Sequence, residues 1–247
     1  MAMASPVGNE RVATGIDGLD ILLYGGIPAG NQVIIAGGPG AGKTLLSLEI
    51  LYNNAKKGVP GAFVSLEEQE NVVIQNFKRA FPDLSDIDDL VANNSLTIGG
   101  EEVTPKVDVG SDSESYSFGN VVSSIESIIR SNNAKCVAID SLSLIKLMFD
   151  NKALYRKYML MLSLNLRKLG VNSFLTIELP YSDRDSLEFS PEFFIFDGTI
   201  VMYQGIEENK RTFNLEVIKM RGSNHSLSFS PYEITNKGFK VFSISDM

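Results

Sequence analysis

The sequence contains a single cysteine and no long apolar run, and both absences exclude whole classes of protein. The one thiol, Cys136, cannot form an internal disulfide, which fits the reducing conditions of the cytosol. No apolar stretch reaches the roughly 18 residues that a membrane-spanning helix needs. The first ten residues lack the charged and apolar regions of a secretory signal. We therefore expect a cytoplasmic protein that does not span a membrane.

Basic residues are also few. The 247-residue chain carries 22 Lys and Arg against 30 Asp and Glu, so its formal net charge is −8 at pH 7. A surface with this balance repels a polyanion unless its basic residues are concentrated in one place. We therefore do not expect nucleic acid as a partner. The hydrophobic content of 44% is sufficient for the core of a folded protein.

Two hydrophobic patterns alternate along most of the chain. Short apolar runs typical of strands, such as NQVIIAG and KCVAID, are separated by longer runs with helical spacing, such as TLLSLEILYNNAKKG. This alternation predicts an α/β fold with a mainly parallel, twisted sheet flanked by helices. From Gly198 onward, apolar and polar residues alternate around turn signals, which predicts antiparallel C-terminal hairpins. Nothing in the pattern divides the chain, so we expect residues 1–247 to form a single domain.

One segment has no sustained periodicity. Residues 99–120, GGEEVTPKVDVGSDSESYSFGN, are rich in glycine, serine and acids. This composition predicts a surface loop that connects two elements. Its acidic character also argues against contact with DNA.

Glycines are concentrated in one short segment. Four glycines and a proline fall within residues 37–42, between a strand-like run and a helix-like run. Such a cluster lets the main chain come very close to a ligand. The spacing Gly-x-x-x-x-Gly-Lys-Thr is that of a phosphate-binding P-loop, in which Lys43 pairs with the β and γ oxygens and Thr44 offers its hydroxyl to Mg²⁺. The predicted nucleotide-binding residues of this loop are Gly38, Pro39, Gly40, Ala41, Gly42, Lys43, Thr44 and Leu45.

Acidic residues after two other strand-like runs complete a predicted catalytic site. Asp140 ends the apolar run KCVAID, where it can serve the metal of a P-loop, and the hydroxyl of Ser141 can join the same network. Hydrolysis also needs a group that aligns water and accepts its proton. Glu67 and Glu68 follow the run GAFVS, and neighbouring residues on a strand point to opposite sides. We expect at least one of them to act as the base, with Glu68 slightly favoured.

With the P-loop, the pair Glu67 and Glu68, and Asp140 in this order along the chain, the sequence resembles the KaiC branch of the RecA-like ATPases. The resemblance extends nearly end to end, through TGIDGLDILLYGGIPAGNQVIIAGGPGAGKT, FVSLEE, IDSLS, EVIKMRGSNHS and PYEITNKGF. It implies a RecA-like P-loop NTPase fold and slow hydrolysis of ATP with Mg²⁺. It also implies catalytic roles for Lys43, Glu67 and Glu68, and metal binding by Thr44 and Asp140.

The resemblance further implies a homo-oligomeric ring, usually a hexamer, with ATP held between subunits. Lys219, Arg221 and His225 would then reach the γ-phosphate bound by the neighbouring subunit, and Asn236 would lie near the base or ribose. A catalytic Arg221 acting in this way would neutralise charge during phosphoryl transfer, an effect worth roughly 10³ to 10⁵ in rate in GTPases. Conformational change driven by ATP would control a regulatory protein partner, whose identity the sequence does not indicate.

One departure from the family bears on its autokinase activity. Where the self-phosphorylating domain of the clock protein has an adjacent Ser-Thr pair, this chain has Phe193 and Phe194. Autokinase chemistry at that place is therefore in doubt, although Ser186 and Ser190 lie nearby. Two other functions remain open: a RecA-type recombinase paralogue that acts on single-stranded DNA, and an ATP sensor that does not hydrolyse its nucleotide.

Overall fold

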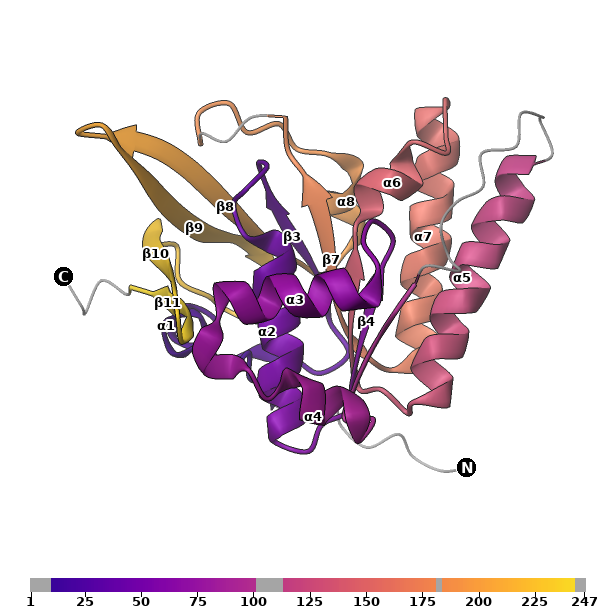
Figure 1. The fold of residues 1–247 in the computed structure, drawn as a ribbon. Helices are drawn as coiled ribbons and strands as arrows, with labels where there is room; N and C mark the ends of the chain where they lie inside the picture. Colours follow the sequence, from indigo (N-terminus) through magenta and orange to yellow (C-terminus); the bar gives the residue numbers. More distant parts are fainter. Residues whose placement is uncertain (1–9, 101–112, 181–183, 243–247) are drawn as a thin grey trace.

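The computed structural model describes residues 10–100, 113–180 and 184–242. Figure 1 shows a central sheet with helices on both faces. Its nine strands have the order β11-β10-β9-β8-β3-β7-β6-β4-β5. The strands from β8 to β5 are parallel, whereas β9, β10 and β11 are antiparallel to their neighbours. The predicted fold class is therefore confirmed. Strand β8, which begins at Gly198, joins the parallel and antiparallel parts of the sheet, since it pairs in parallel with β3 and antiparallel with β9.

The strands are short except at the C-terminal side of the sheet. A separate two-stranded ladder pairs β1 with β2 near the start of the described chain. The bounds are β1 Arg11–Val12, β2 Ile27–Pro28, β3 Gln32–Gly37, β4 Gly61–Ser65, β5 Leu96–Gly99, β6 Cys136–Asp140, β7 Asn172–Glu178, β8 Gly198–Glu207, β9 Lys210–Met220, β10 Ser230–Thr235 and β11 Gly238–Val241.

Alternating residues of β3 supply two hydrophobic cores, one on each face of the sheet. Val33 and Ile35 pack with helices α1 to α4, whereas Ile34 and Ala36 pack with α5 to α8. All four side chains are fully buried, which explains why this strand is apolar throughout. The helices are α1 Asp17–Leu22, α2 Lys43–Lys56, α3 Glu70–Ala80, α4 Ile87–Ala92, α5 Ser113–Ser131, α6 Leu142–Lys146, α7 Lys152–Leu169 and α8 Pro191–Ile195, with a 3₁₀ turn at Pro82–Leu84.

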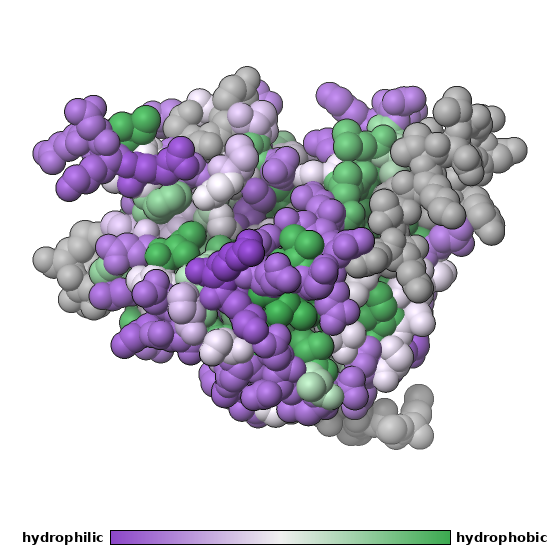
Figure 2. Space-filling view, viewed as in Figure 1, coloured by the Kyte–Doolittle hydropathy of each residue, from purple (hydrophilic) through white to green (hydrophobic). Residues whose placement is uncertain are grey.

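The solvent face of α3 and α4 is mostly hydrophilic, as Figure 2 shows in the view of Figure 1. On α3, for example, only Val73 and Phe77 are fully buried, and the other side chains face outward or lie at the edge of the core. This one-sided distribution is typical of a helix that covers a sheet.

The structure corrects the prediction of a loop over residues 99–120. Helix α5 begins at Ser113, so the prediction was wrong from that residue onward; residues 101–112 lie outside the described part of the chain. Phe118, Val122, Ile125 and Ile129 recur at helical spacing and are buried against the sheet. Tertiary packing of this apolar stripe therefore outweighs the low helix propensity of the glycine and serines at the start of α5.

Candidate functional site

The glycine-rich loop lies at the carboxyl end of β3 and leads directly into α2, as the P-loop motif requires. Gly40 and Gly42 have φ angles of +77° and +92°, which favour glycine. A methyl group on Gly42 would lie 2.9 Å from Phe239 Cζ, and one on Gly37 would lie 2.6 Å from the Met202 carbonyl oxygen. Gly42 therefore needs glycine for both its backbone conformation and its packing, whereas Gly40 needs it for conformation and Gly37 for packing.

Lys43, the first residue of α2, is turned into the loop. Its side chain is buried, and Nζ donates a hydrogen bond of 3.1 Å to the Gly38 carbonyl oxygen across the loop. Burial lowers the pKa of Lys43, while the nearby carboxylates of Glu178, Asp140 and Glu67 act in the opposite direction. An ammonium group held against the main chain of the loop is suited to bind phosphate oxygens.

Asp140, at the end of β6, meets Thr44 although the two residues are far apart in sequence. Thr44 Oγ1 donates to Asp140 Oδ2 at 2.8 Å, and the Thr176 hydroxyl donates to the other carboxylate oxygen. Asp140 is 6% exposed, and its pKa is raised, chiefly by burial. Mg²⁺ prefers carboxylate and hydroxyl oxygens, so this donor set beside the loop fits the metal of a bound nucleotide.

The two adjacent glutamates point in different directions because β4 ends at Ser65 and the chain then bends. A carboxylate oxygen of Glu67 accepts a hydrogen bond from the Ser141 hydroxyl, directly after Asp140. The carboxylate of Glu68 instead lies 3.3 and 3.4 Å from the side-chain nitrogen of Asn76 on α3. The structure therefore brings Glu67 to Lys43 and Asp140, and it directs Glu68 toward α3.

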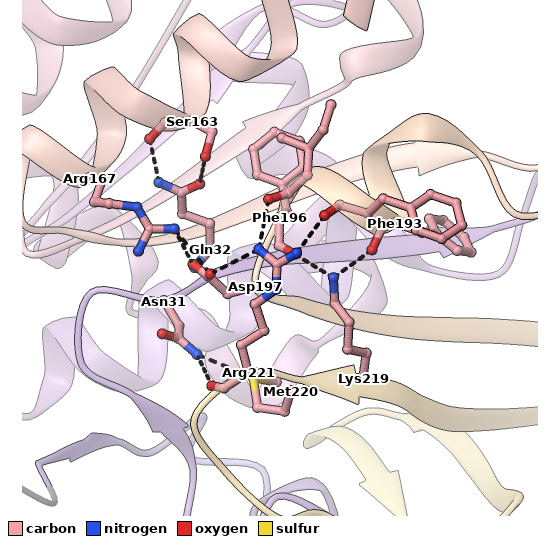
Figure 3. A network of polar contacts seen from close by, with 12 residues as sticks. Asn31, Gln32, Ser163, Arg167, Phe193, Phe196, Asp197, Lys219, Met220 and Arg221 are labelled. Carbon is pink, nitrogen blue, oxygen red and sulfur yellow. Dashed lines mark hydrogen bonds and ion pairs between the residues drawn. The ribbon is translucent and has the colours of Figure 1, made fainter.

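Lys219 and Arg221 lie at the other end of the sheet from the P-loop of the same chain. Met220, between them, pairs with the first residue of β8, whereas Gly37 pairs with Met202 further along β8. Figure 3 shows Lys219 beside Phe193 and Phe196, and Arg221 beside Asp197. Both side chains donate to main-chain carbonyl oxygens of α8 and the residue after it: Lys219 to Phe193 and Phe196, and Arg221 to Phe194 and Ile195. Arg221 also forms an ion pair of 3.7 Å with Asp197.

The two remaining predicted nucleotide residues, His225 and Asn236, follow β9 in the chain. His225 Nδ1 is 2.9 Å from the Ser226 carbonyl oxygen. Asn236 lies in the turn between β10 and β11, where its carbonyl oxygen accepts from the Asp83 amide at 3.1 Å. Within one chain, the structure therefore joins Lys43, Thr44, Asp140 and Glu67, and it does not bring Lys219, Arg221 or His225 to them.

Three residues of the site were not among the sequence predictions. Glu178, at the end of β7, is in register with Gly37, and its negative charge opposes the lowering of the pKa of Lys43 by burial. Tyr232 donates from its hydroxyl to the Ala41 carbonyl oxygen at 2.7 Å, and Thr176 donates to Asp140. The position of Glu178 and Thr176 near the carboxyl end of a parallel strand was the signal that could have identified them. The contact of Tyr232 depends on the placement of β10, which the sequence does not specify.

A cavity of about 370 Å³ opens near the end of β7. It is lined by Ser186 and Ser190, the two serines that the sequence offers near the position of the phosphorylated pair. The hydroxyl oxygen of Ser190, just before α8, is buried. Because a phosphate acceptor must reach the γ-phosphate through open space, burial makes Ser190 a poor candidate. Phe193 is buried and Phe194 is exposed.

Comparison with known proteins agrees with this geometry. A family model described as the ATPase KaiC matches residues 12–246. The chain belongs to the KaiC ATPase family. A KaiC-like protein from the hyperthermophilic archaeon Pyrococcus horikoshii has a similar crystal structure, with a TM-score of 0.80 and 30% sequence identity, over 96% of this chain and 100% of that one.

Two sequence relatives of this KaiC-family chain differ in length. It is 30% identical to the circadian clock oscillator protein KaiC of Picosynechococcus over 97% of its own length and 46% of that protein. It therefore spans about half the length of the clock proteins that it matches. It is 34% identical to a UPF0273 protein of Aeropyrum pernix over 94% of both chains. In the part of the chain that the structure describes, no helix combines the length and apolarity needed to cross a membrane.

Proposed function

We propose that this KaiC-family chain binds Mg²⁺ and ATP at its P-loop and slowly hydrolyses the nucleotide. The observation that carries the proposal is the convergence of Lys43, Thr44, Asp140 and Glu67, which follow three different strands, at one edge of the sheet. Membership of the KaiC ATPase family supports the same conclusion. A chain that needed only a glycine-rich turn would have no reason to place a lysine and two carboxylates together there.

Each residue has a distinct part in this proposal. The amides of the loop and Lys43 hold the β and γ phosphates, while Thr44 and Asp140 hold the metal. A bound Mg²⁺ supplies charge neutralisation on the phosphate oxygens. Glu67 aligns a water molecule and accepts its proton, and the Ser141 hydroxyl fixes the orientation of this carboxylate. Glu68 has at most an indirect role.

The nucleotide site is proposed to lie between subunits of a ring, most simply a hexamer. Lys219, Arg221 and His225 do not reach the P-loop of their own chain, so a role for them in nucleotide binding requires the site of a neighbouring subunit. Asn236 is proposed to contact the base or ribose. A single domain over residues 1–247, a cytoplasmic location and a regulatory protein partner remain parts of this proposal.

Phosphate release by Glu67→Gln and Glu68→Gln tests the assignment of the base. We expect Glu67→Gln to lower kcat by about 10² to 10⁴ and to leave ATP affinity within a few-fold of the parent, since the change removes a proton acceptor and keeps the shape. Glu68→Gln is the matched control and should lower kcat by less than about tenfold. The opposite ranking would reverse the two roles. A parent protein that binds ATP and releases no phosphate would instead be a nucleotide sensor.

A further inference from the structure

The β8–β9 hairpin continues past the end of β3 and stands beside the P-loop. Gly37, the last residue of β3, pairs with Met202, but β8 runs on to Glu207 and returns along β9 from Lys210. Figure 1 shows this long hairpin projecting on the same side of the sheet as the loop that follows β3. The part of the hairpin beyond Met202 therefore flanks the loop that we propose to hold ATP.

Two side chains of the hairpin face the loop directly. Gln204 Nε2 donates a hydrogen bond of 2.8 Å to the Pro39 carbonyl oxygen, which ties β8 to the loop. A methyl group built on Gly40 would lie 3.9 Å from this nitrogen and 4.0 Å from an Arg211 guanidinium nitrogen. Gly40 has no side chain, so nothing at this residue separates the Arg211 guanidinium from the main chain of the loop.

Arg211 also differs from most arginines of the described chain in having no partner. The guanidinium groups of Arg11, Arg130, Arg167, Arg184 and Arg221 all form hydrogen bonds or ion pairs. Among the described residues, none forms such a contact with Arg211, and its side chain is exposed. A planar guanidinium is the group best suited to bind phosphate oxygens through two hydrogen bonds.

We propose that Arg211 is a further nucleotide-binding residue, which contacts the outer phosphates of ATP bound in the P-loop of its own subunit. This assignment rests on the proposed function of the loop. It differs from the roles of Lys219 and Arg221, since it needs no neighbouring subunit. The link from Gln204 to Pro39 keeps the hairpin in place, so that the cation of Arg211 stays beside the phosphates.

Calorimetric titration with ATP and with ADP, in the presence of Mg²⁺, tests this assignment on the full chain. We expect Arg211→Gln to raise the Kd for ATP about tenfold, as for the loss of one charge-assisted hydrogen bond, and to raise that for ADP less. Arg211→Lys keeps the charge and should recover part of the affinity. Arg156→Gln is the matched control, because Arg156 is also exposed and unpaired among the described residues but lies on α7; it should bind like the parent.

The dependence of the ATP affinity on salt separates a direct contact from a change of fold. If Arg211 touches phosphate, its removal in Arg211→Gln should weaken the salt dependence of the ATP affinity and leave the unfolding temperature unchanged. A structural defect would instead lower the unfolding temperature of the variant. A Kd for ATP equal to that of the parent would overturn the assignment, as would equal losses in Arg156→Gln. If the parent takes up no ATP, the proposed function itself fails. If the parent binds ATP and Arg211→Gln binds it equally well, only the assignment of Arg211 fails.

Discussion

Glu49 is a buried acid next to the site, and its protonation links folding to pH. It lies on α2, and its carboxylate accepts from the Phe239 amide at 2.8 Å. Burial raises the pKa of Glu49 from 4.5 to about 7. The folded chain therefore binds this proton more tightly than the unfolded chain does. The stabilisation is complete below pH 4.5 and is lost as the pH rises through 7.

Replacement of Glu49 by glutamine should therefore stabilise the protein at high pH. Glutamine keeps an oxygen that accepts from Phe239 and cannot ionise, so the free energy of unfolding should rise by on the order of 1–3 kcal/mol at pH 8 and change little at pH 5. Chemical denaturation at the two pH values measures this difference. Glu208→Gln, on the exposed β8–β9 turn, is the control and should show no such pH dependence. Destabilisation of Glu49→Gln at pH 8 would contradict the account.

Motif spacing was sufficient to predict where Lys43, Thr44 and Asp140 meet, because parallel strands place their carboxyl ends at one edge of the sheet. The choice between Glu67 and Glu68 was beyond the sequence. It depends on the bend after Ser65, which turns two adjacent carboxylates toward different neighbours.

Two glycines show how differently the same residue acts in two helices. Gly18 lies in α1, where a methyl group would come within 1.7 Å of the Val241 carbonyl oxygen of β11. Gly119 lies in α5, where a methyl group would meet nothing within 4 Å. Gly18 therefore lets α1 pack directly on the last strand, whereas Gly119 only weakens its helix.

Alanine at these two positions should have opposite effects. We expect Gly18→Ala to lower the free energy of unfolding by more than about 2 kcal/mol, because either α1 or β11 must move. Gly119→Ala, the matched control, should raise it by about 0.5–1 kcal/mol. Urea denaturation followed by circular dichroism measures both. If Gly18→Ala unfolds like the parent, the close packing of α1 on β11 is not present in solution.

Most elements were evident from periodicity, but two features depend on contacts between distant segments. The start of α5 has the composition of a loop, and only the burial of its apolar stripe shows that it is helical. The length of the β8–β9 hairpin beyond β3 likewise follows from pairing within the hairpin. Composition alone does not specify either one.

The P-loop and the cations Lys219 and Arg221 lie at opposite ends of the sheet of one molecule. If both belong to one site, as proposed, activity should require assembly of several chains. Light scattering with Mg²⁺ and ATP should give a mass close to six times the 27.0 kDa of one chain. Phosphate release per chain should fall on dilution below the concentration at which the ring forms. A fully active monomer would contradict the proposed interface site.

Mixing two inactive variants tests whether one site takes residues from two subunits. Lys43→Ala removes the lysine of the loop, and Arg221→Gln removes the cation offered to a neighbour; each alone should lower turnover by more than about tenfold. In rings of randomly mixed subunits, about a quarter of the interfaces regain both groups. Activity should therefore return to about a quarter of that of the parent. Mixed rings that remain inactive would place both groups outside a shared site.

The measurement that bears most directly on the whole account is calorimetric titration of the folded chain with ATP and Mg²⁺, run on the parent and on Lys43→Ala. We predict uptake by the parent and a Kd at least about tenfold higher for the variant, because the lysine held at the Gly38 carbonyl oxygen binds the phosphates when nucleotide enters. No uptake by the parent, or equal uptake by the two proteins, would contradict it.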